Sequence, residues 1–316
     1  MYCARYKTVL IATFLSYCFL IPHRMLADSV TLLPIADTTL DETNPNNNLG
    51  ANINFIAGTT AGNLLQPFKN RALLKFDIAG QIPTGATITS ASLTLSMIKA
   101  PIIPANSTFE LRRLLVSWGE GDKSGNAGLQ ATTGEATWTS RFSLLPQWAT
   151  PGGEAGTDFV TNASSTVFMA GLGDYTFAST SDLVADVQLW LDDTNANFGW
   201  MLLSQDEVTA STARRFASRE SVTNAPALLV EYTVPQTPPP QITQPNLSGG
   251  NFTLNFTAEA GFSYAVEYAT LLPTTNWLVL TNITAKTASF DASVSDPIST
   301  DSLRFYRLNR VPCNCR

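Results

Sequence analysis

The sequence predicts an all-β protein: a jelly-roll-like β-sandwich with one short helix, plus a second, smaller β-sandwich after it. Short segments in which apolar and polar residues alternate recur along the chain, and clusters of Gly, Pro and Asn separate them. One segment has the apolar spacing of an amphipathic helix. Many short strands with a single helix are typical of two packed antiparallel sheets.

Residues 1–27 are expected to form a signal peptide. Arg5 and Lys7 precede an almost unbroken apolar run over 9–21, and Ala27 supplies the small residue that signal peptidase needs before the cut. The apolar run is shorter than the roughly 18 to 20 residues that a membrane span needs. We therefore expect a secreted, extracellular or cell-surface protein without a membrane span.

Removal of this segment limits the chemistry of the mature chain. The only histidine, His23, leaves with it, which excludes a Ser-His-Asp triad, a Cys-His pair and a zinc site with imidazole ligands. Three of the 19 basic residues leave as well, so 16 stand against 25 acidic residues and the formal charge is −9. An acidic chain lacks the basic surface that nucleic acid needs, so no nucleic-acid partner is expected.

The mature chain is predicted to form two domains, 28–234 and 246–311, joined by a Pro-rich linker over 235–245. Prolines in this linker block helix and sheet hydrogen bonding and favour an extended spacer. A tail over 312–316 carries Cys313 and Cys315. This pair could bridge to another chain, bind a soft metal or remain inert, and its strained spacing favours an inert tail.

The clearest strand of the first domain is 87–97, where Ala91, Leu93, Leu95 and Met97 alternate with polar residues. A period of two places these apolar side chains on one face of a half-buried strand. Similar segments run over 109–116, 174–177, 199–203 and 228–232.

The helix is predicted over 181–192. Ser181 is the expected cap, and Leu183, Val184, Val187 and Leu191 have the spacing of one helical face. We expect this helix to pack across the sandwich.

Tryptophan and charged residues gather on long Gly-rich connections in the middle of the chain, where binding groups are commonly displayed. Aromatic rings stack on the apolar faces of sugars, while carboxylates and guanidinium groups bind sugar hydroxyls. The predicted ligand-binding residues are Trp118, Glu120, Asp122, Trp138, Trp148 and Arg112. Replacing Trp118 or Trp148 by Ala should then weaken binding and leave the fold intact. The alternative is that the tryptophans only pin the loops to the sandwich.

Hard oxygen donors on turns suggest a structural Ca²⁺, to which we assign Asp37, Asn48 and Glu220. Such an ion would hold the first strand to the last. Their spacing matches no EF-hand loop. Asn-rich turns also form without metal, because Asn tolerates positive φ, so ordinary turn formation is the alternative.

Several segments together resemble the DNRLRE-type domains grouped with family 96 carbohydrate-binding modules. They are the Asn-rich turn 46–50, the strand 71–78, the Val-Gln-x-Trp run 187–190, the Asn-x-Gly-Trp turn 197–200, the run 214–220 that ends in Ser218-Arg219-Glu220, and the closing strand 225–232. The resemblance implies an extracellular carbohydrate-binding module. It also makes an acidic, uronate-containing polysaccharide such as alginate a candidate ligand.

The second domain resembles the small immunoglobulin- or fibronectin-like modules of secreted bacterial proteins. The resemblance rests on the segments 261–270, 276–280 and 303–308. Alternation of Tyr264, Val266 and Tyr268 with Ala265 and Glu267 independently predicts a sandwich strand. Trp277 is expected in the core of this domain.

The predicted function is non-catalytic binding of a polysaccharide outside the cell. One alternative is a structural or adhesive surface protein without a sugar site. The other, less favoured, is a polysaccharide lyase or hydrolase that uses a pair of acids such as Glu120 with Asp122 or Glu154 with Asp158.

Overall fold

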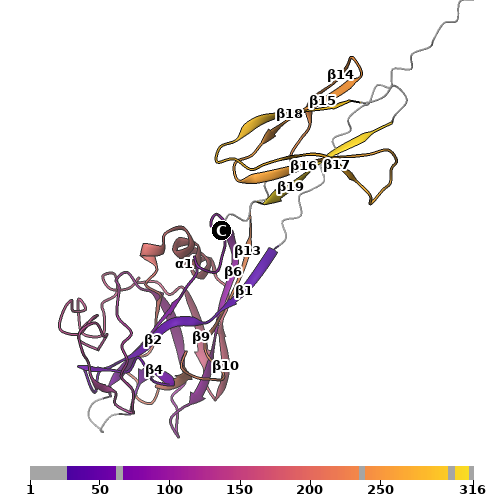
Figure 1. The fold of residues 1–316 in the computed structure, drawn as a ribbon. Coiled ribbons are helices and arrows are strands. Elements are labelled where there is room, and N and C mark those ends of the chain that lie inside the picture. The colour runs from indigo at the N-terminus through magenta and orange to yellow at the C-terminus, as the bar shows by residue number, and fades with distance from the viewer. Residues whose placement is uncertain (1–26, 62–66, 235–238, 298–302, 313–316) are drawn as a thin grey trace, which may run out of the picture. The chain divides into compact units, whose positions relative to one another are not determined.

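The computed structural model describes residues 27–61, 67–234, 239–297 and 303–312 (Figure 1). Residues 1–26 of the expected signal peptide and both cysteines of the tail lie outside these ranges. The chain divides at Pro235 into two compact units. None of the described helices is long and apolar enough to span a membrane.

The larger unit consists of short strands and one α-helix. In chain order its elements are β1 (Ala27–Leu32), β2 (Pro34–Asp41), β3 (Asn47–Asn48), β4 (Asn54–Thr59), β5 (Lys69–Phe76), β6 (Thr87–Lys99), β7 (Ser107–Arg113), β8 (Leu129–Gln130), β9 (Ser165–Met169), β10 (Gly173–Phe177), α1 (Ser181–Asp192), the 3₁₀ turn η1 (Thr194–Ala196), β11 (Trp200–Ser204), β12 (Arg214–Ala217) and β13 (Ala227–Thr233). The predicted all-β class with one short helix is confirmed.

Eleven of these strands form one curled antiparallel sheet. Its order is β1-β13-β6-β12-β4-β5-β11-β7-β9, with β10 paired to β6 and β2 paired to β5. The sheet turns from one layer into the other at β4, which pairs with β12 over four residues but with β5 only at Gly58 and Thr59. Figure 1 shows β1, β13 and β6 side by side in one layer.

The main core lies between the two layers of the curled sheet. The alternation predicted in β6 is confirmed, because Ala91, Leu93, Leu95 and Met97 are all buried in this core. Trp190 of α1 and Trp200 of β11 meet there with ring centroids 4.4 Å apart. Burial of these large side chains between the layers is the dominant stabilising term for the fold.

The helix α1 spans the predicted residues but begins from a different cap. Thr180 is the N-cap, and its hydroxyl accepts a hydrogen bond from the amide of Leu183 at 3.0 Å. Ser181 is therefore the first helical residue and not the cap, because the extended backbone needed at that position falls one residue earlier. The side-chain oxygen of Gln188 in α1 accepts a hydrogen bond from the backbone N–H of Ile88 and so holds the helix to β6.

The smaller unit contains two three-stranded sheets around its own core. The strands are β14 (Thr243–Ser248), β15 (Asn251–Ala258), β16 (Phe262–Ala269), β17 (Leu278–Ile283), β18 (Phe290–Pro297) and β19 (Phe305–Pro312), in the orders β14-β15-β18 and β17-β16-β19. The first of these strands begins inside the range expected as linker. Phe256 and Tyr264 are central to the core.

Trp277 does not belong to this core, so that prediction is wrong. The side chain is only half-buried, and the guanidinium of Arg307 lies 4.3 Å from its ring centroid. Trp277 directly precedes β17, whose first residues Leu278 and Val279 are exposed. The ring is thus covered by a cation on the outside of the sheet.

Candidate functional site

The long connection between β7 and β9, residues 114–164, forms a second core on the outer face of the sheet. From the sheet come Leu40, Leu73, Met201 and Leu203, and from the connection come Leu114, Ala136, Trp138, Trp148 and Phe159. Strands β5 and β11 are therefore buried on both faces. This explains why apolar residues run continuously through Ala72-Leu73-Leu74 instead of alternating.

Two of the predicted ligand-binding tryptophans are part of this second core. Trp138 and Trp148 are only 6% and 4% exposed, and the Trp148 indole donates to the carbonyl of Thr137 at 2.9 Å. Trp118 is half-buried and donates its indole N–H to the carbonyl of Phe198. Protein covers the rings of Trp138 and Trp148, so these rings support the loops and are not open to a sugar in this structure.

Arg71 of β5 clamps the connection to the sheet. Its guanidinium forms two hydrogen bonds with the carboxylate of Glu207, at 2.8 and 2.6 Å, and donates to the carbonyls of Gly152 and Gly153. The same cation lies 5.8 Å from the ring centroid of Trp138. A partly buried two-pronged ion pair of this kind fixes loop geometry, which a binding site on the loops requires.

Glu120 lies in a carboxylate–guanidinium cluster formed by Asp37, Glu120, Arg219 and Glu220. Arg219 donates twice to Glu120, at 2.6 and 2.9 Å, and its Nε also lies 3.0 Å from a Glu220 oxygen. The backbone N–H of Arg219 donates to Asp37, whose own N–H donates to Glu120. The cluster joins the turn after β12 to β2 and to the long connection.

Burial controls the protonation of this cluster. Asp37 is 1% exposed, and burial raises its pKa to about 8, with the nearby charges of Glu220 and Glu120 adding to the shift. Burial also raises the pKa of Glu120, against the opposing hydrogen bond from Arg219. Glu220 keeps one buried carboxylate oxygen without a hydrogen bond.

The three residues assigned to Ca²⁺ lie in the same neighbourhood but do not form a ligand set. Asn48 accepts from the backbone N–H groups of Gly50 and Lys123 and donates to two carbonyls, so its amide oxygen is occupied. The guanidinium of Arg219 supplies the positive charge beside Asp37 and Glu220. Across the described ranges, no group of three or more His, Cys, Asp or Glu is arranged to hold a metal ion.

The remaining predicted ligand residues, Asp122 and Arg112, are held by local partners. Asp122 is exposed and forms an ion pair with Lys123, while Arg112 bonds to Glu110 and to the carbonyl of Thr161. Asp158 accepts the N–H groups of Ala149 and Glu154 with one oxygen. Arg112, Asp122 and Glu120 thus each pair with an oppositely charged side chain, and Trp138 and Trp148 are buried.

A concave site does lie on the connection beside the buried tryptophans. It is a cavity of about 260 Å³, which we call the amide–hydroxyl pocket, lined by Asn46, Gln130, Thr137, Thr139, Ser140, Ser143, Leu144 and Gln147. Apart from Leu144, every lining side chain is a neutral amide or hydroxyl. Thr139 is fixed by hydrogen bonds to Asn46 and to the carbonyl of Pro45.

Gln147 offers the freest hydrogen-bonding group of this pocket. Its side chain is exposed and makes no hydrogen bond to another described residue. The next residue, Trp148, is anchored in the second core, so the backbone that carries Gln147 is held in place. The arrangement presents a preformed set of neutral donors and acceptors.

A second polar cavity, about 400 Å³, lies between α1 and the residues before β9. Arg113 and Asp186 line it and form an ion pair at 2.8 Å. Asp186 also accepts from Ser164 and from the indole of Trp200, and burial raises its pKa. Arg113 thus faces α1 while Arg112 lies over Phe159, as expected for neighbouring residues of a strand, whose side chains point to opposite faces.

Sequence reasoning missed the residues of the amide–hydroxyl pocket. Neutral side chains such as Gln130, Thr139 and Gln147 have no distinctive spacing and are common in any turn. The available signal was their position next to Trp138 and Trp148, because a residue beside a buried anchor is held rigidly at the surface.

Comparisons with protein-family models and with curated proteins found no match. The class that the fold itself defines is an all-β protein with a large curled antiparallel sheet and smaller antiparallel sheets.

Proposed function

We propose that this chain is a secreted, non-catalytic polysaccharide-binding protein whose larger unit binds a neutral glycan in the amide–hydroxyl pocket. The observation that carries the proposal is the chemistry of the lining: seven neutral amide or hydroxyl side chains and one aliphatic side chain. Amides and hydroxyls match the alternating donors and acceptors of sugar hydroxyls. Leu144, which is exposed at the rim, offers an apolar contact for a sugar face.

A neutral glycan fits this pocket better than the uronate polymer that the family resemblance suggests. No cationic side chain lines the pocket, so a uronate carboxylate would lose water without gaining an ion pair. Because the mature chain is acidic overall, an acidic ligand would need cations at its own site, and this pocket has none. The cavity is smaller than the ~300–1,000 Å³ typical of small-molecule sites, which suits one end or a single unit of a chain.

We further propose that the larger unit is a DNRLRE-type module. The motif that carries this resemblance, Ser218-Arg219-Glu220, has a physical role in the fold. Arg219 binds Glu120 and, through its backbone, Asp37, so the turn fastens the long connection to the sheet. A module built to hold a loop-borne site is consistent with extracellular glycan binding.

Absence of catalysis is part of the proposal. The acid pairs considered for hydrolysis have structural partners: Glu120 is engaged by Arg219, and one oxygen of Asp158 accepts two backbone N–H groups. A general acid and a nucleophile have to face a shared open site. Neither pair lines the amide–hydroxyl pocket.

The second candidate function is a structural or adhesive surface protein. Burial of Trp138 and Trp148 favours it, because these rings are used to hold the loops. The two functions differ in one measurable property, since the structural protein has no glycan ligand.

A glycan array separates them. The chain from Asp28 to Arg316 should retain neutral glycans, and Gln147→Ala should lose the signal while its melting temperature is unchanged, because the Gln147 side chain is exposed. Gln81→Ala, an exposed glutamine outside the pocket, is the matched control. If the native chain gave no signal on the array, the structural or adhesive function would be favoured instead.

A further inference from the structure

The larger unit presents a distinct surface at the end of the sheet away from its chain connections. Ala27 pairs with Thr233, and Thr233 pairs with Thr87 at the start of β6, so the chain enters and leaves at this end. Strand β6 then runs 13 residues to Lys99, roughly 40 Å away at the usual rise per residue. The loop that follows therefore lies at the far end.

Large aliphatic and aromatic side chains are exposed at this far end. Ile102 and Ile103, on the loop between β6 and β7, are 102% and 83% exposed. Prolines at 101 and 104 flank them and restrict the backbone, so the loop cannot readily fold back to cover them. We name as the tip surface Ile98, Ile102, Ile103, Phe168, Leu172 and Val208, all exposed.

Register places the other members of the tip surface beside the loop. Leu172 precedes Gly173, which pairs with Met97 next to Ile98. Phe168 pairs with Thr108 at the start of β7. Val208 belongs to the segment after β11, whose Gln205 N–H donates to the carbonyl of Thr108. Exposed apolar side chains from two strands and three connections thus gather at one end of the sheet, and such a group marks a contact surface.

Two cations without acidic partners lie directly behind the tip surface. Lys99 and Arg215 are opposite each other in the β6–β12 pair, and Arg215 is also opposite Ile56 of β4. Neither cation makes an ion pair with any residue in the described part of the chain. Like charges directly opposite each other destabilise a sheet, so this pair is better explained by an external anion. Both cations line a mostly apolar cavity of about 190 Å³.

Arg214 holds this end together and adds a third positive charge. Its buried guanidinium donates to the carbonyls of Ser211, Thr212 and Ala213 and to Ala105 in the loop. Its bonds are to carbonyl oxygens and not to a carboxylate, and burial lowers its pKa.

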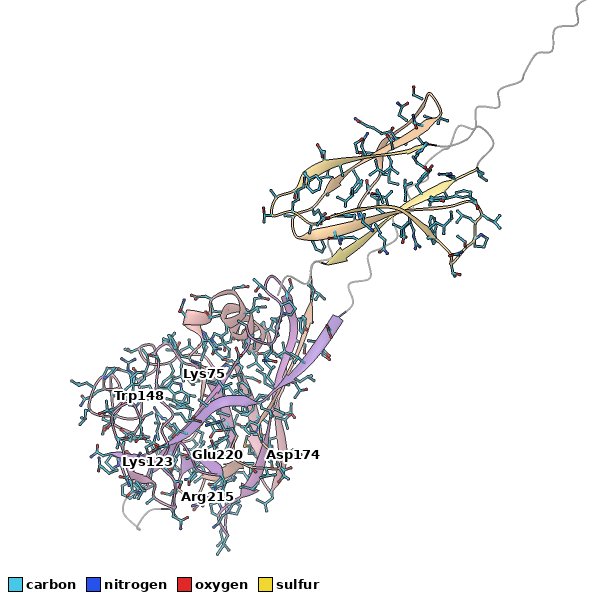
Figure 2. The ribbon with its side chains drawn as sticks, viewed as in Figure 1. Lys75, Lys123, Trp148, Asp174, Arg215 and Glu220 are labelled. Atoms are coloured by element: carbon cyan, nitrogen blue, oxygen red, sulfur yellow. The ribbon has the colours of Figure 1, made fainter. Side chains whose placement is uncertain are left out.

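One acid at this end, Glu207, is paired with the guanidinium of Arg71. Asp206 and Asp174 accept hydrogen bonds only from uncharged donors, the N–H groups of Val208 and Thr209 and the hydroxyl of Ser96, and neither forms an ion pair with Lys99 or Arg215. Figure 2 labels Arg215 and Asp174 in this part of the larger unit. The local surface thus combines protruding apolar groups with cations that remain available to an anion.

We propose that the tip surface docks on the surface of a lipid bilayer that contains anionic headgroups. Protruding side chains on a restrained loop can enter the acyl boundary without a shaped partner, whereas a protein partner would have to supply a pocket for each. Lys99 and Arg215 lie immediately behind the loop, where headgroup phosphates would meet them. The chain connections, at the other end of β6, stay clear of the bilayer.

Vesicle sedimentation tests this docking. The protein used is the chain from Ala27 to Arg316, because it contains all the residues that the structure describes. Binding should be stronger to phosphatidylcholine vesicles that contain phosphatidylglycerol than to phosphatidylcholine alone. Lys99→Glu and Arg215→Glu should each lower the partition coefficient by about fivefold or more, and Ile102→Ser with Ile103→Ser by about tenfold or more. Melting temperatures should not fall, because Ile102, Ile103 and Lys99 are exposed, and because Lys99→Glu or Arg215→Glu places opposite charges across the strand pair.

The matched controls are Lys75→Glu and Val222→Ser. Lys75 lies away from Arg215 in Figure 2, and Val222 is a single exposed apolar residue on another loop. Equal loss in tip and control variants would overturn the proposal, as would equal binding to both vesicle types. The proposal would also be overturned if the protein bound no vesicles but associated with itself, or bound an acidic glycan, and the same tip variants abolished that binding. The tip surface would then be assigned to that second copy or to that glycan.

Discussion

At the scale of single residues, the Asp37 carboxyl shows how the fold controls charge. Its burial among Glu120, Arg219 and Glu220 raises its pKa from an ordinary value of 3.8 to about 8. In the folded protein Asp37 therefore holds a proton over a pH range in which the unfolded chain has released it. Because the folded state binds more protons there, the free energy of unfolding falls as pH rises from about 4 to about 8.

Asp37→Asn should remove much of this pH dependence. Asn keeps an oxygen that can accept the Arg219 N–H but does not ionise. We expect the melting temperature of the native protein to fall between pH 5 and pH 8 and that of the variant to fall less. Glu120 and Asp186 leave a residual slope of the same sign, since burial raises the pKa of both. Identical pH profiles for the two proteins would contradict the assignment.

Calcium provides a second test at this scale. Because Arg219 already neutralises part of the cluster and Asn48 uses its oxygen for backbone N–H groups, chelation should leave the melting temperature of the larger unit unchanged. Thermal melts with and without EDTA, followed by excess Ca²⁺, measure this. A fall of several degrees that Ca²⁺ restores would instead support the site predicted from Asp37, Asn48 and Glu220.

At the scale of elements, the long connection 114–164 is where sequence reasoning reached its limit. Alternation located β6, β10 and β13 within a residue or two, because one face of each strand meets the core, and the segment expected over 199–203 matches β11 within one residue. It could not show that β5 and β11 are covered on both faces, since that depends on a loop that packs as a second core. The tryptophans in that loop were therefore expected at the surface.

Trp148→Ala should destabilise the larger unit, contrary to the expectation that its fold would be unaffected. The ring fills the second core and its indole binds Thr137, so its loss should lower the free energy of unfolding by about 3–5 kcal/mol. Urea denaturation measures the change. Trp277→Ala, which removes a half-buried ring in the smaller unit, should cost less. Equal effects would show that the second core is not packed as described.

At the scale of the whole molecule, two units with separate cores follow from the sequence pattern. The Pro-rich segment lies between them, and each unit has its own set of buried apolar residues. Mild proteolysis should cut near Pro238 to Gln241, before β14, and leave two folded β-rich fragments. Circular dichroism of the separated fragments checks this, and loss of structure in either fragment on cleavage would show that it depends on the other.

Neutral glycan binding in the amide–hydroxyl pocket is tested most directly by calorimetric titration of an array-selected neutral oligosaccharide. Native protein, Gln147→Ala and the control Gln81→Ala would be titrated at low and high salt. We predict that the affinity of the native protein hardly changes with salt. Gln147→Ala should weaken binding by about 1–3 kcal/mol, and Gln81→Ala should leave the affinity unaltered. Binding that persists unchanged in Gln147→Ala, or that weakens steeply with salt, would contradict the account.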